Sequence, residues 1–266
     1  MTLLAFLREE VPDAPSVKAL KRWIEGKRCT VNGRVEIFST HPLKAGDSVI
    51  LDCDFSKEVL KPMLLWEDEW LKAFDKPAGV ISSPEHFKGL LVHRLDKETS
   101  GVLLVSKSKK ILELMVDLFR QKKVDKTYLA LVDGVIREKE GTISSKLAAK
   151  HRYQGQTIYG SSKKGQLAET CWKRVGIGPM ATLLECYPLT GRTHQIRVHL
   201  KEAGHPILGD LQYGRHFKCA YRPFRHLLHA YKISFPHPVT GEQIALEAPL
   251  PGDFLSAIAA CGIIKA

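Results

Sequence analysis

Short segments typical of β-strands, separated by turns, dominate the chain after residue 64 and restrict its fold more than any other feature. They are W-L-K-A-F from residue 70, G-V-L-L-V-S from 101, T-Y-L-A-L-V from 127, T-C-W-K-R-V from 170 and A-T-L-L-E-C from 181. One amphipathic helix interrupts them, with an apolar stripe from Ile111 to Phe119 and Ser108 as its N-cap. Short strands in series with scattered helices predict an α+β fold with a mainly antiparallel sheet.

The first 55 residues have the pattern of a separate small unit. Ser16 can cap a helix whose Val17, Leu20 and Ile24 share one face. The pair Asn32-Gly33 then predicts a β-hairpin, because both residues accept the positive φ that its turn requires. We expect an α+β domain over residues 1–55, a linker over 56–64 and the strand-rich body over 65–266.

The formal charge of +11 belongs entirely to the body, since residues 1–55 hold eight basic and eight acidic residues. Such an excess favours a polyanionic partner, because each cation placed on a phosphate releases condensed counterions. Within the neutral front unit, basic side chains gather between residues 18 and 34. This cluster fits either an ordinary solvated helix face or a contact with nucleic acid. It consists of Lys18, Lys21, Arg22, Lys27, Arg28 and Arg34.

Several classes of protein fit the sequence poorly. The five apolar residues in M-T-L-L-A-F-L-R-E-E are too few for a signal-peptide core, and no segment has the length of a membrane span, so we expect a cytoplasmic protein. The six cysteines form no C-x-x-C pair, which favours reduced thiols and no metal site. Phosphate-binding glycine motifs are also absent from the sequence, so we expect no nucleotide cofactor.

The first segment that could carry chemistry is V-H-R-L-D-K-E-T-S-G, residues 92–101. Asp96 there could simply accept hydrogen bonds from the N–H groups of a turn. Alternatively, it could be a lone reactive carboxylate, because Arg94 and Lys97 flank it and an apolar strand follows. Paired-carboxylate chemistry is disfavoured, since Glu98 is the only other acid nearby.

The second segment is T-G-R-T-H-Q-I-R-V-H-L, residues 190–200. The alternation of apolar Ile196, Val198 and Leu200 with polar residues fits a strand. Thr193 as a cap and Gly204 as a terminator favour a helix, which we predict. The two histidines are five residues apart, a spacing that suits a metal site on neither element. Arg192 and Arg197 are better suited to phosphates or to a carboxylate partner.

Together these segments carry a family resemblance. H-R-L-D-K-E-T-S-G-V-L-L-V from residue 93 resembles the signature of the RluA-type pseudouridine synthases. Further stretches match in the family's order, and the front unit resembles the S-four-type RNA-binding domain through I-E-G-K-R-C-T-V-N-G and K-A-G-D. The body's further matches are D-K-P-A-G from 75, K-T-Y-L-A-L-V from 126, L-T-G-R-T-H-Q-I-R-V-H-L with H-P-I-L-G-D from 189, and R-H-L-L-H-A from 225. Asp75 departs from the family's usual asparagine.

The resemblance implies an RNA pseudouridine synthase that acts as a monomer on ribosomal or transfer RNA without a cofactor or metal. It implies that Asp96 is the nucleophile or the electrostatic partner that attacks the target uridine, and that Arg197 pairs with this carboxylate. Tyr128 would stack on the base and take part in the proton transfer. Arg94 would enter the space left by the flipped nucleotide, while Arg192 and the basic cluster of the front unit would contact RNA. Two other interpretations remain: a non-catalytic RNA-binding factor, and a hydrolase that uses Asp96 with a histidine.

Overall fold

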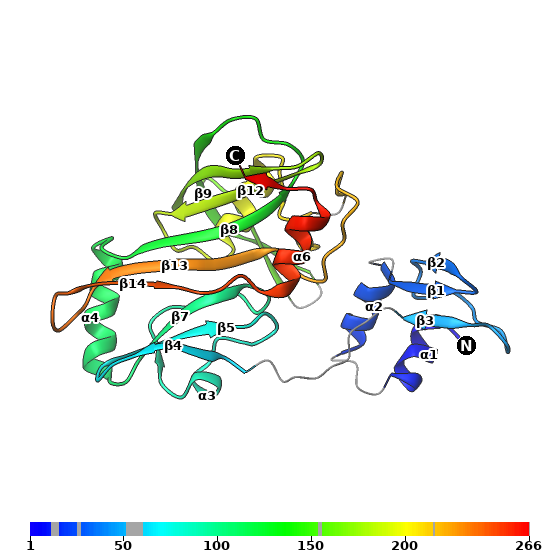
Figure 1. Ribbon diagram of the computed structural model, residues 1–266, viewed down its shortest axis with the longest axis horizontal. Helices are drawn as coiled ribbons and strands as arrows, with labels where there is room; N and C mark the ends of the chain where they lie inside the picture. Colours follow the sequence, from blue (N-terminus) through cyan, green and yellow to red (C-terminus); the bar gives the residue numbers. More distant parts are fainter. Residues whose placement is uncertain (12–15, 26–27, 52–60, 154–155, 215, 266) are drawn as a thin grey trace. The chain divides into compact units, whose positions relative to one another are not determined.

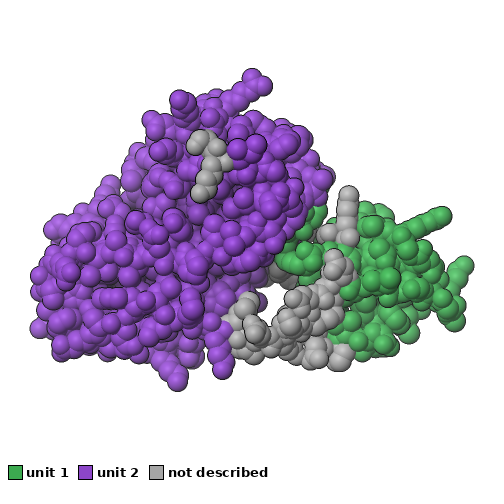
Figure 2. Space-filling model, in the orientation of Figure 1, with its two compact units in different colours: residues 1–59, 222–224 green, residues 60–221, 225–266 purple. Residues whose placement is uncertain are grey.

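The computed structural model describes residues 1–11, 16–25, 28–51, 61–153, 156–214 and 216–265, without the side chains of residues 18, 22, 153 and 265. The chain divides into two compact units (Figure 2). The smaller unit comprises residues 1–59 and 222–224, and the larger unit, the body, comprises residues 60–221 and 225–266.

The smaller unit packs two helices against a three-stranded sheet with strand order β2-β1-β3. Its core includes Leu3, Leu7, Leu20 and Ile24. The elements are α1 (Leu3–Glu10), α2 (Val17–Glu25), β1 (Cys29–Val31), β2 (Arg34–Glu36) and β3 (Val49–Leu51). The predicted hairpin is confirmed: β1 and β2 pair around Asn32 and Gly33, whose φ angles of 51° and 76° lie in the left-handed region.

Part of the predicted basic cluster and of the predicted linker lies outside the described residues. This applies to Lys27, to the side chains of Lys18 and Arg22, and to linker residues 56–60. Lys21 and Arg34 are described, and both side chains are exposed. The last two residues of the predicted linker, 63 and 64, already belong to strand β4.

The body is built around one large sheet (Figure 1). Its first elements are β4 (Met63–Glu67), β5 (Leu71–Lys76), α3 (Pro84–Phe87), β6 (Leu90–Leu91), β7 (Ser100–Ser106), α4 (Lys109–Arg120), β8 (Asp125–Asp133) and β9 (Glu140–Tyr153). They are followed by β10 (Gln156–Ser161), β11 (Gln166–Ile177), β12 (Ala181–Pro188), α5 (Gln195–Glu202), β13 (Leu228–Pro236), β14 (Gln243–Glu247), α6 (Gly252–Ala260) and β15 (Ile264–Lys265).

The strand order along the sheet is β10-β9-β11-β12-β8-β13-β7-β5-β4, with β14, β15 and β6 attached at the side. Neighbouring strands run antiparallel except β13 and β7, which pair in parallel through His229 and Ala230. This confirms the predicted α+β fold with a mainly antiparallel sheet. None of the helices in the described part of the chain is long and apolar enough to cross a membrane.

The two largest hydrophobic clusters in the described part of the body cover different parts of the sheet. One lies on β5, β7 and the later half of β13, and the other lies on β8, β12 and the start of β13. In the first, Ile111 and Met115 of α4 pack with β5 and β7, and Ser108 caps α4 as predicted. In the second, Ile196 of α5 and Phe254 of α6 pack against β8 and β12. The segment before β7 and the start of α5 are therefore each fixed to a separate core.

Candidate active site

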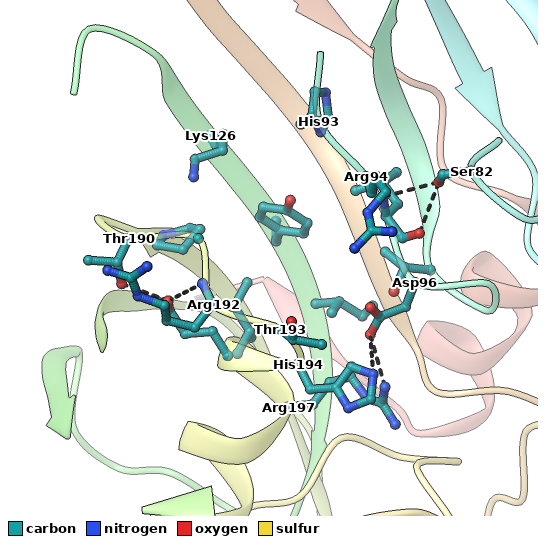
Figure 3. Close-up of a pocket in the computed structure, with 18 of the residues that line it drawn as sticks. Ser82, His93, Arg94, Asp96, Lys126, Thr190, Arg192, Thr193, His194 and Arg197 are labelled. Atoms are coloured by element: carbon teal, nitrogen blue, oxygen red, sulfur yellow. Dashed lines mark hydrogen bonds and ion pairs between the residues drawn. The ribbon is translucent and has the colours of Figure 1, made fainter. Parts of the chain in front are cut away.

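A pocket of about 630 Å³ lies in the body where the segment before β7 faces the start of α5. Its walls come from residues 91–99, from β8 and from residues 188–197 (Figure 3). Asp96 and Arg94 belong to the first wall, and Tyr128 belongs to β8. Arg192 and Arg197 come from the third wall, so the predicted residues of the body line one cavity.

Asp96 and Arg197, 101 residues apart in sequence, form an ion pair across this pocket. Arg197 Nη1 donates to Asp96 Oδ2 over 2.9 Å. The Asp96 side chain is 28% exposed, whereas that of Arg197 is only 6% exposed. In the described part of the chain, no hydrogen bond or ion pair reaches the second oxygen of Asp96, Oδ1. One oxygen is therefore held, and the other is available to a substrate.

Arg197 is itself held by a buried network. Its Nε and Nη2 donate to the two oxygens of Asp210 over 2.7 and 2.9 Å, and Nη2 also donates to Gln212 Oε1 over 2.6 Å. Asp210 is 1% exposed, so this bidentate pair is shielded from water. Burial acts to lower the pKa of Arg197, but its hydrogen bonds to Asp210 and the charges of Asp210 and Asp96 raise it overall. The guanidinium is a permanent cation beside Asp96.

The segment around Asp96 is held mainly through its backbone. The fully buried ammonium of Lys76, in the D-K-P-A-G motif, donates to the carbonyls of Pro77, Val80 and Lys97 over 2.9 to 3.1 Å. Burial lowers the pKa of Lys76 to about 8. Lys76 thereby joins the loop after β5 to the loop that carries Asp96.

Two buried histidines fix the residues that follow. His226 Nε2 lies 2.8 Å from the hydroxyl of Thr99, and His229 Nδ1 lies 2.9 Å from the hydroxyl of Ser100. Burial lowers the pKa of both imidazoles, that of His229 to about 4, so both are neutral at pH 7. Further contacts join Ser82 Oγ to the backbone of Leu95, and Arg225 Nη1 to the carbonyl of Glu98.

The remaining pocket residues supply an aromatic surface and positive charge. Tyr128 is half-buried, and burial followed by the negative charge of Asp96 raises the pKa of its phenol. Arg94 and Arg192 are exposed and come from opposite walls (Figure 3). Arg192 Nε donates to the carbonyl of Leu167. The pocket thus combines a carboxylate, aromatic rings and exposed cations.

The second motif forms a helix, as predicted, but the helix begins one residue later. The N-cap of α5 is His194 and not Thr193, and His194 adopts the left-handed conformation with φ 56°. Its ring points toward Asp96 and does not cap the helix (Figure 3). His199 is fully buried and lies within hydrogen-bond distance of Ser145 and Thr170. Among the described residues, no group of acidic, histidine or cysteine side chains is placed to hold a metal.

Other members of the site do not follow from the sequence motifs. The motifs predict no role for His194, Asp210, Gln212 or Tyr213, and none for Lys126, which lines the pocket. Asp210 is the last residue of the H-P-I-L-G-D motif, so the sequence shows that an acidic residue stands there. The sequence does not show that Arg197 is its partner, because Arg197 reaches Asp210 and Asp96 only once α5 has folded.

Comparisons with known proteins give the class to which this fold and site belong. Residues 71–202 match the model of the RNA pseudouridylate synthase family. Ribosomal large subunit pseudouridine synthase C of Escherichia coli (strain K12) is 34% identical over 92% of this chain and 88% of its own. The protein of the same name from Pasteurella multocida (strain Pm70) is 38% identical over 72% of this chain and 65% of its own.

Solved structures of similar fold come from the same class of protein. The human RNA pseudouridylate synthase domain containing 1 protein is 28% identical, with a TM-score of 0.65 over 77% of this chain and 89% of its own. The human domain containing 4 protein is 25% identical, with a TM-score of 0.63 over 76% of this chain and 94% of its own. The chain belongs to the RNA pseudouridylate synthase family, which makes it an isomerase with the pseudouridine synthase fold.

Proposed function

We propose that this enzyme converts specific uridines of large-subunit ribosomal RNA to pseudouridine, with Asp96 as its catalytic carboxylate. The observation that carries the proposal is the ion pair in the pocket, in which Arg197 holds Asp96 Oδ2 and leaves Oδ1 open. The names of the relatives, ribosomal large subunit pseudouridine synthases, support this choice of RNA. Transfer RNA is the alternative substrate.

The proposed reaction needs a charged carboxylate but no cofactor. The bond between N1 of uracil and C1′ of ribose breaks, and a bond between C5 and C1′ forms. The proton lost from C5 is balanced by one gained at N1, so no atom or electron is lost. Asp96 attacks the flipped uridine, and the bond that its carboxylate forms breaks again before the product leaves, so the aspartate is regenerated. The permanent charge of Arg197 keeps the carboxylate ionised and oriented.

The rest of the pocket would hold the uridine outside the RNA stack. Enzymes that act on a base in structured nucleic acid extrude it into a fitted pocket, and a volume of about 630 Å³ accommodates one nucleotide. Tyr128 stacks on the uracil ring and takes part in the proton transfer. Arg94, exposed on the wall that carries Asp96, enters the gap that the flipped nucleotide leaves.

A test is to map pseudouridine in ribosomal and transfer RNA from cells with the intact gene, without it, and with a gene encoding Asp96→Asn. We expect sites in large-subunit ribosomal RNA that disappear with the gene and return only with the wild type. Loss of sites in transfer RNA alone would overturn the choice of substrate. Full restoration by Asp96→Asn would overturn the role of Asp96.

We further propose that the front unit, with the predicted boundaries 1–55, is an RNA-binding domain of the S-four type. The exposed Lys21 and Arg34 support this, because cations on one unit can hold phosphates while the body performs the chemistry. The double variant Lys21→Ala/Arg34→Ala should bind RNA more weakly, with a salt slope reduced by roughly 0.7 to 0.9 for each phosphate that is no longer bound. The saturated single-turnover rate should not change.

A matched control keeps the charge change equal. Arg8 and Lys44 are exposed cations of the same unit outside the cluster, so Arg8→Ala/Lys44→Ala removes the same charge. We expect this control to keep the wild-type salt slope. Equal slopes for the two double variants would show that the cluster has no specific contact with RNA. We also expect a monomer in the cytoplasm, which light scattering and cell fractionation would test.

A further inference from the structure

His194 occupies a position in the site that no role yet explains. Its Nε2 lies 3.7 Å from Asp96 Oδ2, the same oxygen that accepts the hydrogen bond of Arg197. Its Nδ1 lies 2.7 Å from the hydroxyl oxygen of Tyr213. The imidazole therefore bridges a tyrosine hydroxyl and the proposed catalytic carboxylate.

The backbone and the neighbouring rings keep the imidazole in this place. His194 has φ 56° and ψ 18°, a conformation that is uncommon for a residue with a Cβ atom. The rings of Tyr159 and Tyr213 meet it edge-on, with centroids 5.5 and 5.6 Å away. The Cζ atom of Arg197 lies 5.0 Å from the centre of the Tyr213 ring. The Tyr213 ring therefore supports both the His194 imidazole and the Arg197 guanidinium.

The hydrogen bonds of Tyr213 determine which imidazole nitrogen carries the proton. The backbone N–H of Tyr159 donates to the Tyr213 hydroxyl oxygen over 3.1 Å. His194 Nδ1 is then the acceptor available to the hydroxyl proton among the described residues. With Nδ1 accepting, a neutral imidazole carries its proton on Nε2, which faces Asp96.

The carboxylate favours the same tautomer. A lone pair on Nε2 would face the negative oxygen of Asp96, whereas an N–H bond presents its positive end. Several charges act on the ring, and burial lowers the pKa of His194 although Asp96 and Asp210 act to raise it. Arg197 also lowers this pKa, so the imidazole is neutral at pH 7 and its tautomer matters.

We propose that His194 is a positioning residue for Asp96: its Nε2–H fixes the rotation of the carboxylate, and Tyr213 fixes the tautomer that makes this possible. The single hydrogen bond from Arg197 sets the distance of Oδ2 but leaves the carboxylate plane free to turn. At 3.7 Å this contact is longer than a hydrogen bond, so the neutral imidazole acts through the direction of its N–H dipole. The role rests on the proposed function of Asp96, which His194 would orient.

The direct test reads the tautomer by nitrogen NMR of histidine-labelled protein at pH 7.5, with the His194 signal assigned by its disappearance in His194→Asn. We expect a protonated Nε2 and an unprotonated Nδ1. In Tyr213→Phe we expect a mixture of tautomers, whereas Tyr231→Phe, which removes a surface hydroxyl bonded to Glu247, should leave the signal unchanged. A proton on Nδ1 in the wild type would overturn the proposal.

The kinetic test uses two substitutions that keep different halves of the imidazole. Asn tolerates the left-handed conformation and can accept from Tyr213, but it cannot reach Asp96. Gln places an N–H near the position of Nε2. We expect His194→Asn to lower the saturated single-turnover rate by roughly tenfold to a hundredfold with unchanged RNA affinity. His194→Gln should recover most of this activity, and equal rates in both variants would overturn the proposal.

The double variant His194→Asn/Tyr213→Phe tests whether Tyr213 acts through His194 or only through packing. If Tyr213 acts through His194, then Tyr213→Phe should lower the rate in the wild type but have no further effect in His194→Asn. Additive effects would overturn the link between the two residues. Failure of the proposed function looks different: the wild type itself would then form no pseudouridine in ribosomal RNA, while the tautomer measurement would still give its result.

Discussion

Two walls of the pocket are held in place by different kinds of interaction: the Asp96 wall, residues 91–99, and the α5 wall, residues 188–197. On the Asp96 wall, residues 97–99 are bound through backbone carbonyls and a hydroxyl by Lys76, Arg225 and the neutral His226. On the α5 wall, Arg197 is bound through its own charge by Asp210. The Asp96 side chain therefore takes little part in holding its wall, whereas the Arg197 side chain holds its own.

This difference separates chemistry from stability. A side chain that does not support its surroundings can be replaced without unfolding them. A buried ion pair behaves otherwise, because removing one partner leaves the other charge buried and unpaired. Substitutions on the two walls should therefore differ in how they divide their effect between activity and stability.

The largest effect on activity is expected from Asp96→Asn. Asn keeps the shape and can still accept from Arg197, but it has no negative charge with which to attack. Pseudouridine formation should fall at least about a thousandfold, a decrease comparable with removal of a nucleophile. The free energy of unfolding in urea should stay within about 1 kcal/mol of the wild type, since the side chain is 28% exposed.

The matched control for this prediction is Asp117→Asn, which removes an exposed carboxylate from α4 and should change neither quantity. A large decrease in the stability of Asp96→Asn would contradict the idea that its wall is held by the backbone.

Arg197→Met should lower both activity and stability. Asp96 loses its cation, and Asp210, 1% exposed, loses both hydrogen bonds from the guanidinium. We expect a cost of about 3–5 kcal/mol in unfolding free energy and a decrease in rate of roughly a hundredfold or more at saturating RNA. Urea unfolding and single-turnover assays measure the two effects separately.

The double variant Arg197→Met/Asp210→Asn removes the carboxylate charge that Arg197→Met alone leaves buried and unpaired. It should recover much of the stability and none of the activity. Recovery of neither would mean that Arg197 supports its wall through packing and not through its pairing with Asp210.

Acid should weaken the Asp96 wall through its two histidines. In the unfolded chain each takes up a proton near pH 6.5, whereas burial holds the pKa of His229 at about 4 and that of His226 well below its usual value. Stability from this source is complete above pH 6.5 and is lost as the pH falls. By pH 5 the decrease should reach about 2 kcal/mol for each histidine.

Urea unfolding at pH 5, 6 and 7 measures this slope. His226→Gln should reduce the slope by about one proton, whatever its own stability. His86→Gln changes an exposed histidine and should leave the slope unchanged. An unchanged slope in His226→Gln would mean that this imidazole is already protonated in the folded protein.

The two walls also differ in how far they can be predicted from the sequence. Strands β5, β7, β8, β11 and β12 and helix α4 follow from periodicity and caps, because each signal lies within a dozen residues. The long hairpin of β9 and β10 does not, since its serines, lysines and alanines have no clear alternation. Its pairing depends instead on neighbouring strands, which no local pattern reveals.

The same limit applies to the site. Asp96 and Arg197 are identified from short motifs, and the structure places them 2.9 Å apart. The residues that hold them in place are not identified from motifs. His226, Tyr213 and Asp210 act across sequence separations that no motif spans. Short motifs therefore predict the groups that could react and miss those that hold them.

The smallest expected effect concerns the two exposed arginines on opposite walls. Arg94 lies two residues before Asp96, so its removal should affect the flipped state, and Arg94→Ala should lower the saturated rate by roughly tenfold. Arg192, whose Nε bonds Leu167, lies at the start of the α5 wall and would meet a phosphate. Arg192→Ala should leave the saturated rate unchanged and reduce the salt slope of RNA binding by roughly 0.7 to 0.9. Binding over a salt series, paired with single-turnover rates at saturating enzyme, separates the two effects. The reverse pattern, a lower rate for Arg192→Ala and a changed slope for Arg94→Ala, would mean that the gap left by the flipped nucleotide is filled from the α5 wall.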